Sequence, residues 1–94
     1  MKKCLKITVT GKVQGVGYRE FVQKNAMKLA VEGTIQNTGD GSVIIFACGM
    51  AKHLDELIDL LYQGSNSSKV SNVFAEPHML EKNFRGVFRI IGVD

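Results

Sequence analysis

The sequence predicts an α+β fold in which two helices cover one face of a single sheet. Three patterns support this prediction. Apolar and polar residues alternate over residues 5–10, as in a half-buried strand. Two later segments carry apolar residues at helical spacing. Between them, a turn-forming stretch at residues 37–41 separates two further strand-like runs, which indicates a hairpin.

The chain opens with a strand, a glycine-rich loop and a helix. In the first strand, residues 5–10, apolar side chains alternate with Lys or Thr. Three glycines in residues 11–17 break this pattern and predict a loop. From Tyr18 the spacing becomes helical, and Gly33 ends the region. The apolar face of this helix is formed by Tyr18, Phe21, Val22, Ala26 and Leu29.

The predicted hairpin and a second helix follow. Residues 34–36 form a short strand, residues 37–41 the turn, and residues 43–48 are apolar at nearly every position. Such an apolar run is typical of a strand that is central in a sheet or covered on both faces. The second helix places Leu54, Leu57, Ile58 and Leu61 on one face, and Gly64 suits the position after its C-terminus.

The last third of the chain predicts two more strands. After a serine-rich loop at residues 64–69, a strand is expected at residues 70–75 and is stopped at Pro77. Residues 79–86 are predicted as loop and residues 87–91 as the final strand. The element order predicts a ferredoxin-like sandwich, with two helices on one face of a mostly antiparallel four- to five-stranded sheet. We expect the sheet order 4-1-3-2, with the last strand beside strand 2, in a single domain spanning residues 1–94.

Composition narrows the class of function. The chain of 94 residues is long enough for one domain and not for two. Twelve basic and nine acidic residues give a net charge of +3, without a run of like charges that would indicate a nucleic-acid surface. The N-terminus lacks the apolar segment of a signal peptide, and no apolar stretch reaches transmembrane length. We therefore expect a cytoplasmic protein that binds neither nucleic acid nor membrane.

The most informative stretch is Gly11–Arg19, which reads Gly-Lys-Val-Gln-Gly-Val-Gly-Tyr-Arg. It leads into a helix N-terminus, where the first N–H groups lack partners and the helix dipole is positive. Glycines allow consecutive N–H groups to point into one concavity. Arg19 adds a forked cation, which disfavours the helix by roughly 0.3–1 kcal/mol unless an anion binds beside it. The stretch is either an anion site or a plain connector with a surface arginine, and it matches neither the dinucleotide fingerprint nor the P-loop.

These residues resemble the acylphosphatase family. Gly11–Arg19 is similar to a first family signature, Gly-x-Val-Gln-Gly-Val-x-Phe/Tyr-Arg. Residues 33–43 are similar to a second, Gly-x-Val-x-Asn-x-x-Asp-Gly-x-Val, and the resemblance spans nearly the whole chain. Three departures bear on substrate preference and loop geometry. Thr34 stands where the family often has an aromatic residue, Ile44 where an acidic residue is common, and Gly64-Ser65 replaces the usual Gly-Pro.

The resemblance implies hydrolysis of the carboxyl-phosphate bond of small acyl phosphates, with no metal and no cofactor. Arg19 is the expected bidentate ligand of the phosphoryl oxygens. Asn37 is expected to hold the attacking water, although an Asn before a Gly-containing turn can also serve only to shape it. The carboxylate leaving group needs no general acid, so positioning and charge stabilisation suffice. The implied phosphate cradle, which acts mainly through backbone N–H groups, comprises Gln14, Gly15, Val16, Gly17, Tyr18 and Arg19.

Inorganic phosphate is expected to bind as product and inhibitor of a monomeric enzyme. Two other functions are compatible with the expected element order. A non-catalytic anion-binding or regulatory domain on the same fold would have no need of Asn37. An RNA-binding domain with a similar element order would need aromatic residues on its central strands, where only Phe46 is available.

Cys4 and Cys48 are predicted to be neighbours. Cys4 opens the first strand and Cys48 closes the third, and these strands are antiparallel neighbours in the expected sheet order. Both cysteines fall on the face turned away from the helices, so they are expected within disulfide distance. A reducing cytoplasm favours two free thiols, and the sequence leaves open whether the bond forms. Two cysteines are too few for a zinc site.

Overall fold

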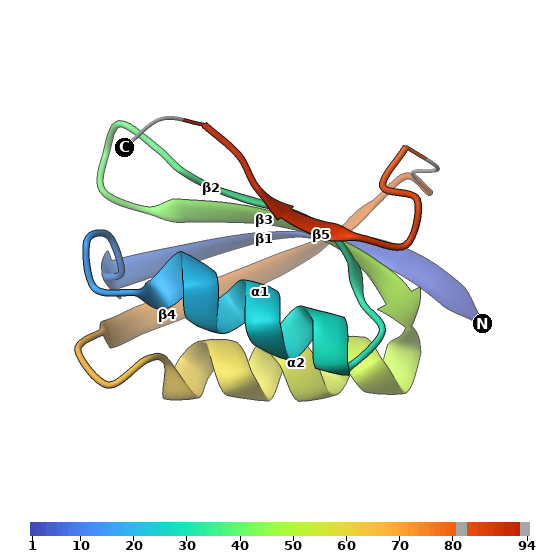
Figure 1. The fold of residues 1–94 in the computed structure, drawn as a ribbon, viewed down its shortest axis with the longest axis horizontal. Helices are drawn as coiled ribbons and strands as arrows, with labels where there is room; N and C mark the ends of the chain where they lie inside the picture. Colours follow the sequence, from blue (N-terminus) through green and yellow to red (C-terminus); the bar gives the residue numbers. More distant parts are fainter. Residues whose placement is uncertain (81–82, 93–94) are drawn as a thin grey trace.

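The computed structural model describes residues 1–80 and 83–92. The elements within these residues are, in chain order, β1 (Lys2–Lys12), α1 (Tyr18–Lys28), β2 (Glu32–Asn37), β3 (Val43–Met50), α2 (Ala51–Gln63), β4 (Lys69–His78) and β5 (Phe88–Ile90). The strands form one sheet in the order β4-β1-β3-β2-β5, and both helices lie on one face of it (Figure 1). The pairs among β1 to β4 are antiparallel, whereas β5 runs parallel to β2. The predicted ferredoxin-like sandwich, its sheet order and the position of the last strand are confirmed.

The core lies between the helices and the inner face of the sheet. Alternate residues of the central strands are buried there, for example Ile7, Val9 and Ile45, which have no exposed surface. The neighbouring residues of the same strands are more exposed, so the period-two pattern of β1 does correspond to one buried face. The helices contribute their apolar stripes, formed by Tyr18, Val22 and Ala26 of α1 and by Leu54, Leu57 and Leu61 of α2.

The prediction that Pro77 stops the fourth strand is wrong. β4 continues to His78, and Pro77 is the register partner of Leu5 in β1. Because β4 lies at the edge of the sheet, it tolerates a residue that cannot donate on its unpaired side. Other boundaries shift by a few residues: β2 covers residues 32–37, β3 runs to Met50, and β5 is limited to residues 88–90. Residues 81–82 of the predicted loop and residues 93–94 of the predicted domain lie outside the described residues.

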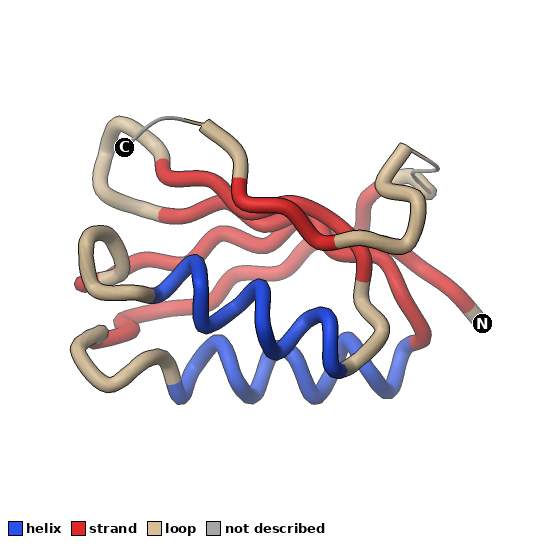
Figure 2. The backbone as a smooth tube through the Cα atoms, viewed as in Figure 1, coloured by secondary structure: helices blue, strands red, loops and turns tan. Residues whose placement is uncertain are grey.

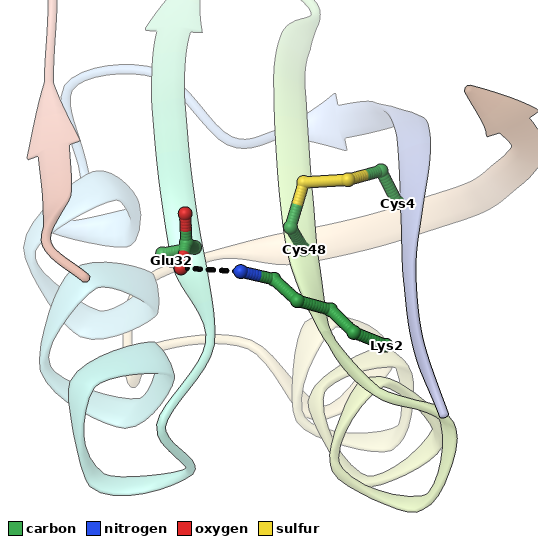
Figure 3. The surroundings of a disulfide bond; sticks show 4 residues. All are labelled: Lys2, Cys4, Glu32 and Cys48. Atoms are coloured by element: carbon green, nitrogen blue, oxygen red, sulfur yellow. Dashed lines mark hydrogen bonds and ion pairs between the residues drawn. A yellow bond between two sulfur atoms is a disulfide. The ribbon is translucent and has the colours of Figure 1, made fainter. Parts of the chain in front are cut away.

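Cys4 and Cys48 form a disulfide in this structure (Figure 3). They are register partners of β1 and β3, and their Cα atoms are 4.1 Å apart. Both residues are buried, and an ion pair of 2.8 Å between Lys2 and Glu32 lies beside them (Figure 3). The predicted proximity is confirmed, and of the two states that the sequence left open the structure has the bonded one.

Three loops lie together at one end of the sheet. They are the β1–α1 loop (residues 13–17), the β2–β3 loop (residues 38–42) and the α2–β4 loop (residues 64–68). Figure 2 shows them as tan turns at the end of the molecule away from the N-terminus. This arrangement brings both predicted motifs to the same end of the fold.

Candidate active site

A cavity of about 490 Å³ opens at this end of the molecule. It brings the β1–α1 loop together with Asn37, the last residue of β2. Val16 is the one residue of the predicted phosphate cradle that does not line the cavity in the described part of the chain, and its side chain packs against the core instead. The lining consists of Val13, Gln14, Gly15, Gly17, Tyr18, Arg19, Glu20 and Asn37.

The backbone of the β1–α1 loop curls around an open space. Gly15 and Gly17 have left-handed conformations with φ of 71° and 74°. A Cβ atom at either position would meet nothing within 4 Å, so the backbone conformation, and not the available space, requires glycine here. Gly17 is followed by Tyr18, the first residue of α1. A left-handed residue followed by a right-handed one directs successive N–H groups, here those of residues 17–19, into one concavity that suits an anion.

The N-terminus of α1 adds to this positive environment. Within the described residues no side chain caps the helix, and the first backbone bond of α1 runs from the Phe21 N–H to the Gly17 carbonyl at 3.1 Å. The N–H groups before Phe21 have no carbonyl partner within the helix, and the helix dipole gives them partial positive charge. Arg19 is half-buried in this first turn and lines the same cavity. Backbone donors and a guanidinium on one cavity favour a small anion with several oxygens, such as phosphate.

The side chain of Gln14 connects the β1–α1 loop to the β2–β3 loop. Its Nε2 atom donates to the carbonyls of Thr38 at 2.9 Å and Ser42 at 2.8 Å. The side-chain nitrogen of Gln14 is therefore already hydrogen-bonded within the protein. Gln14 would contact a bound anion through its backbone N–H group. Gln14 thus fixes the β1–α1 loop against the hairpin that carries Asn37. Sequence reasoning missed this role, because nothing in the sequence shows which carbonyls face Gln14.

Asn37 is half-buried at the cavity, and its Oδ1 atom is buried. The turn after it is held by Asp40, whose carboxylate accepts hydrogen bonds from the Thr38 hydroxyl, the Ser42 hydroxyl at 2.6 Å and the Ser42 N–H at 3.1 Å. These bonds, with that of the Ser42 side chain first, lower the pKa of Asp40 from 3.8 to about 2. Asp40 therefore shapes, as an ionised carboxylate, the turn that the sequence predicts at residues 37–41.

The side chain of Tyr18 leaves the site and anchors α1 to α2. The ring is buried, and its hydroxyl donates to the carbonyl of Leu61 at 2.8 Å. Burial raises the pKa of Tyr18 above its usual value, because the phenolate would be desolvated. Tyr18 can therefore serve the cavity through its backbone N–H, whereas its neutral hydroxyl is occupied elsewhere.

The chemistry available at this site is sparse. No three His, Cys, Asp or Glu side chains are grouped as metal ligands within residues 1–80 and 83–92. The same part of the chain contains no helix that is long and apolar enough to cross a membrane. The cavity offers backbone N–H groups, the guanidinium of Arg19, the amide of Asn37 and the carboxylate of Glu20. Fold and cavity together define a small α+β protein with a cavity at a helix N-terminus, lined by donors that suit a phosphate-like anion.

Comparison with known proteins gives the family. The family model described as Acylphosphatase matches residues 5–90. An acylphosphatase of Rhodopseudomonas palustris (strain BisB18) is 44% identical over 71 residues, which cover 76% of this chain and 72% of the relative. The solved acylphosphatase of Coxiella burnetii superposes with a TM-score of 0.89 at 37% identity, covering 96% of this chain and 93% of that one. The solved acylphosphatase of Bacillus subtilis superposes with a TM-score of 0.90 at 34% identity, covering 98% of this chain and 100% of that one.

The chain belongs to the acylphosphatase family. The resemblance inferred from the two motifs is thereby confirmed over nearly the whole chain. The members named above are hydrolases, and the comparisons favour no non-catalytic class for this chain.

Proposed function

We propose that this chain hydrolyses the carboxyl-phosphate bond of small acyl phosphates to a carboxylate and inorganic phosphate. The observation that carries this proposal is the cavity where the β1–α1 loop, Arg19 and Asn37 meet. Family membership supports the same reaction.

The phosphoryl group is bound by the β1–α1 loop. Its oxygens accept hydrogen bonds from the N–H groups of residues 14–19, foremost those of residues 17–19, and from the Arg19 guanidinium in a bidentate pair. Phosphoryl transfer passes through a loose transition state with charge spread over these oxygens. Donors that are fixed in advance stabilise that charge without reorganisation, which is the main source of catalysis in such a site.

The attacking water is held by the side-chain amide of Asn37. Its oxygen attacks phosphorus as the bond from phosphorus to the acyl oxygen breaks. The bonding electron pair leaves with the carboxylate, and a phosphate oxygen takes the proton of the water. The conjugate acid of the leaving group has a pKa of about 4, so the carboxylate departs without a general acid. The reaction therefore needs positioning and charge, and we assign it no metal and no cofactor.

The proposal also covers the location, the oligomeric state and the inhibitor of the enzyme. We propose a cytoplasmic monomer that acts as a single domain, with inorganic phosphate as product and competitive inhibitor. A non-catalytic anion-binding domain is the second candidate, and it differs in one measurable respect: it would bind phosphate at this loop without turning over any acyl phosphate.

The test is phosphate release from benzoyl phosphate in excess chelator, with substitutions at both residues. Arg19→Ala and Arg19→Lys should each lose most binding and turnover, because a point charge does not replace the guanidinium fork. Asn37→Ala should lower kcat by about 10²–10³-fold and leave phosphate inhibition nearly unchanged, as loss of one positioned group does elsewhere. The exposed Arg89 and Asn72 provide matched controls as alanine variants, and these should behave as wild type.

Three results would contradict the proposal. If a chelator abolished the activity and a divalent metal restored it, the metal-free mechanism would be wrong. A normal kcat in Asn37→Ala would remove the water-holding role. Phosphate binding without turnover in the wild type would establish the non-catalytic domain.

A further inference from the structure

The β1–α1 loop is held from two sides. Figure 1 shows it between the β2–β3 loop and the α2–β4 loop at one end of the sheet. Gln14 ties it to the first of these neighbours. On the other side the hydroxyl of Ser65, in the α2–β4 loop, donates to the carbonyl of Val16 at 3.0 Å. No part of the reaction proposed above assigns a role to Ser65.

The bonded carbonyl belongs to the same peptide group as a donor of the cradle. The carbonyl of Val16 and the N–H of Gly17 share one planar peptide unit, and in a trans peptide they point in opposite directions. A carbonyl drawn toward Ser65 therefore turns the Gly17 N–H away from Ser65. Gly17 lines the cavity, and its N–H is the first of the three that converge there.

We infer that Ser65 is a positioning residue of the phosphate site, whose hydroxyl sets the orientation of the Gly17 N–H. This inference rests on the proposed function, because it names phosphate as the ligand whose binding Ser65 tunes. Ser65 touches neither substrate nor water in this scheme. It acts only through the peptide group between Val16 and Gly17.

This peptide group has particular need of an anchor. It joins Val16 to Gly17, which has a left-handed conformation, and glycine has the greatest backbone freedom of any residue. A hydrogen bond to the carbonyl opposes rotation of the whole peptide plane. Without that bond the Gly17 N–H would spend part of its time turned out of the concavity, and the phosphoryl oxygens would lose a donor.

Ser65 is itself held in place by its own turn. Its carbonyl accepts from the Ser68 N–H at 3.1 Å and from the Ser68 hydroxyl at 2.9 Å. The preceding residue, Gly64, donates its N–H to Leu60 at 2.9 Å and so ties the turn to the end of α2. The hydroxyl that reaches Val16 is thus presented by a closed turn on a helix. A residue that orients part of a binding site must itself be held rigidly, and this turn holds Ser65 in that way.

The first experiment compares Ser65→Ala with Ser67→Ala. Both remove one serine hydroxyl from the same loop, Ser67 is exposed, and Ser65→Ala keeps the backbone carbonyl that closes the turn. Ser65→Ala should raise the inhibition constant of inorganic phosphate and the KM for benzoyl phosphate by about fivefold, the effect of one hydrogen bond. Ser67→Ala should leave both within twofold of wild type. A purely structural role for Ser65 would lower the melting temperature of Ser65→Ala and change neither constant.

A second pair of variants holds the side-chain volume constant. Ser65→Thr keeps a hydroxyl, and Ser65→Val replaces it by a methyl group of similar size. Thr should restore phosphate inhibition to within about twofold of wild type and Val should not. This pair also decides the question if Ser65→Ala proves too unstable to assay, because both of its members fill the same space.

The direct readout is the amide resonance of Gly17 during a titration with inorganic phosphate. Phosphate should shift this resonance in the wild type and shift it much less in Ser65→Ala. Phosphate inhibition of Ser65→Ala within 1.5-fold of wild type, or equal constants for the Thr and Val variants, would overturn the inference while leaving the proposed hydrolysis intact. A wild type that binds phosphate at Gly17 but hydrolyses no benzoyl phosphate would instead overturn the proposed function, and the role of Ser65 in binding would stand.

Discussion

Replacement of Gln14 by leucine removes the two hydrogen bonds that join the β1–α1 loop to the hairpin of Asn37. A typical hydrogen bond contributes about 0.5–1.5 kcal/mol net, so two contribute about 1–3 kcal/mol. Neither acceptor would be left without a donor. The carbonyl of Thr38 also accepts from the Gly41 N–H at 3.3 Å, and that of Ser42 from the Thr38 N–H at 2.9 Å. We therefore expect the lower part of this range, about 1–2 kcal/mol, which corresponds to roughly 4–16 °C in Tm for a domain of this size.

The effect of Gln14→Leu on activity should exceed its effect on stability. Once these hydrogen bonds are lost, the proposed phosphate cradle and the Asn37 amide proposed to hold water are no longer fixed relative to each other, and kcat/KM should fall at least about tenfold. The matched control is Gln23→Leu. That substitution removes one hydrogen bond, from Gln23 to the carbonyl of Phe88 at 2.9 Å, and Gln23 does not line the cavity. It should lower Tm by about half as much and leave kcat/KM unchanged.

Thermal melts and steady-state hydrolysis of benzoyl phosphate measure both quantities on the same samples. Equal losses of Tm in the two leucine variants, with kcat/KM preserved in Gln14→Leu, would refute the tether. The pair separates a general loss of stability from a loss of alignment, because Gln14 bridges the two motifs and Gln23 does not.

Three further predictions concern the disulfide, the rim of the cavity and the turn. Reduction of the Cys4–Cys48 bond, which closes a separation of 44 residues, should lower the free energy of unfolding by about 4 kcal/mol, and Cys48→Ser should abolish the effect of reductant in denaturant titrations. Glu20 is exposed on the cavity lining and should repel phosphate. Glu20→Gln should therefore strengthen phosphate inhibition about two- to threefold at low salt and leave it unchanged at high salt. Glu56 is also exposed, and Glu56→Gln should leave phosphate inhibition unchanged at either salt concentration. Because the pKa of Asp40 is lowered to about 2, its carboxylate stabilises the fold above about pH 4, and this contribution is lost as the pH falls through 2. The Tm of Asp40→Asn should therefore lie below that of wild type at pH 7 and meet it near pH 2 in melts across this range.

Much of this protein was determined by its sequence alone. The alternation in residues 5–10 and the helical stripes gave the elements, because these periods follow from backbone geometry and need no partner to be recognised. The element order then restricted the sheet order, including the neighbouring positions of Cys4 and Cys48. The glycine pattern before Arg19 indicated a loop that curls at the start of α1, because glycine is the residue that readily adopts the left-handed conformations found at Gly15 and Gly17. Its role in binding an anion stays a prediction.

The tertiary structure decided which partner each polar side chain takes. Gln14 donates to two carbonyls more than twenty residues away, and Ser65 donates to the carbonyl of Val16. Tyr18 points its hydroxyl into the core, and Pro77 continues a strand because that strand is at the edge. Local sequence sets backbone conformation, but a hydrogen bond between distant loops depends on how the whole sheet brings them together. Two short sequence motifs therefore predict the proposed phosphate site, while the hydrogen bonds that hold the β1–α1 loop in shape form only when the three loops meet at one end of the fold.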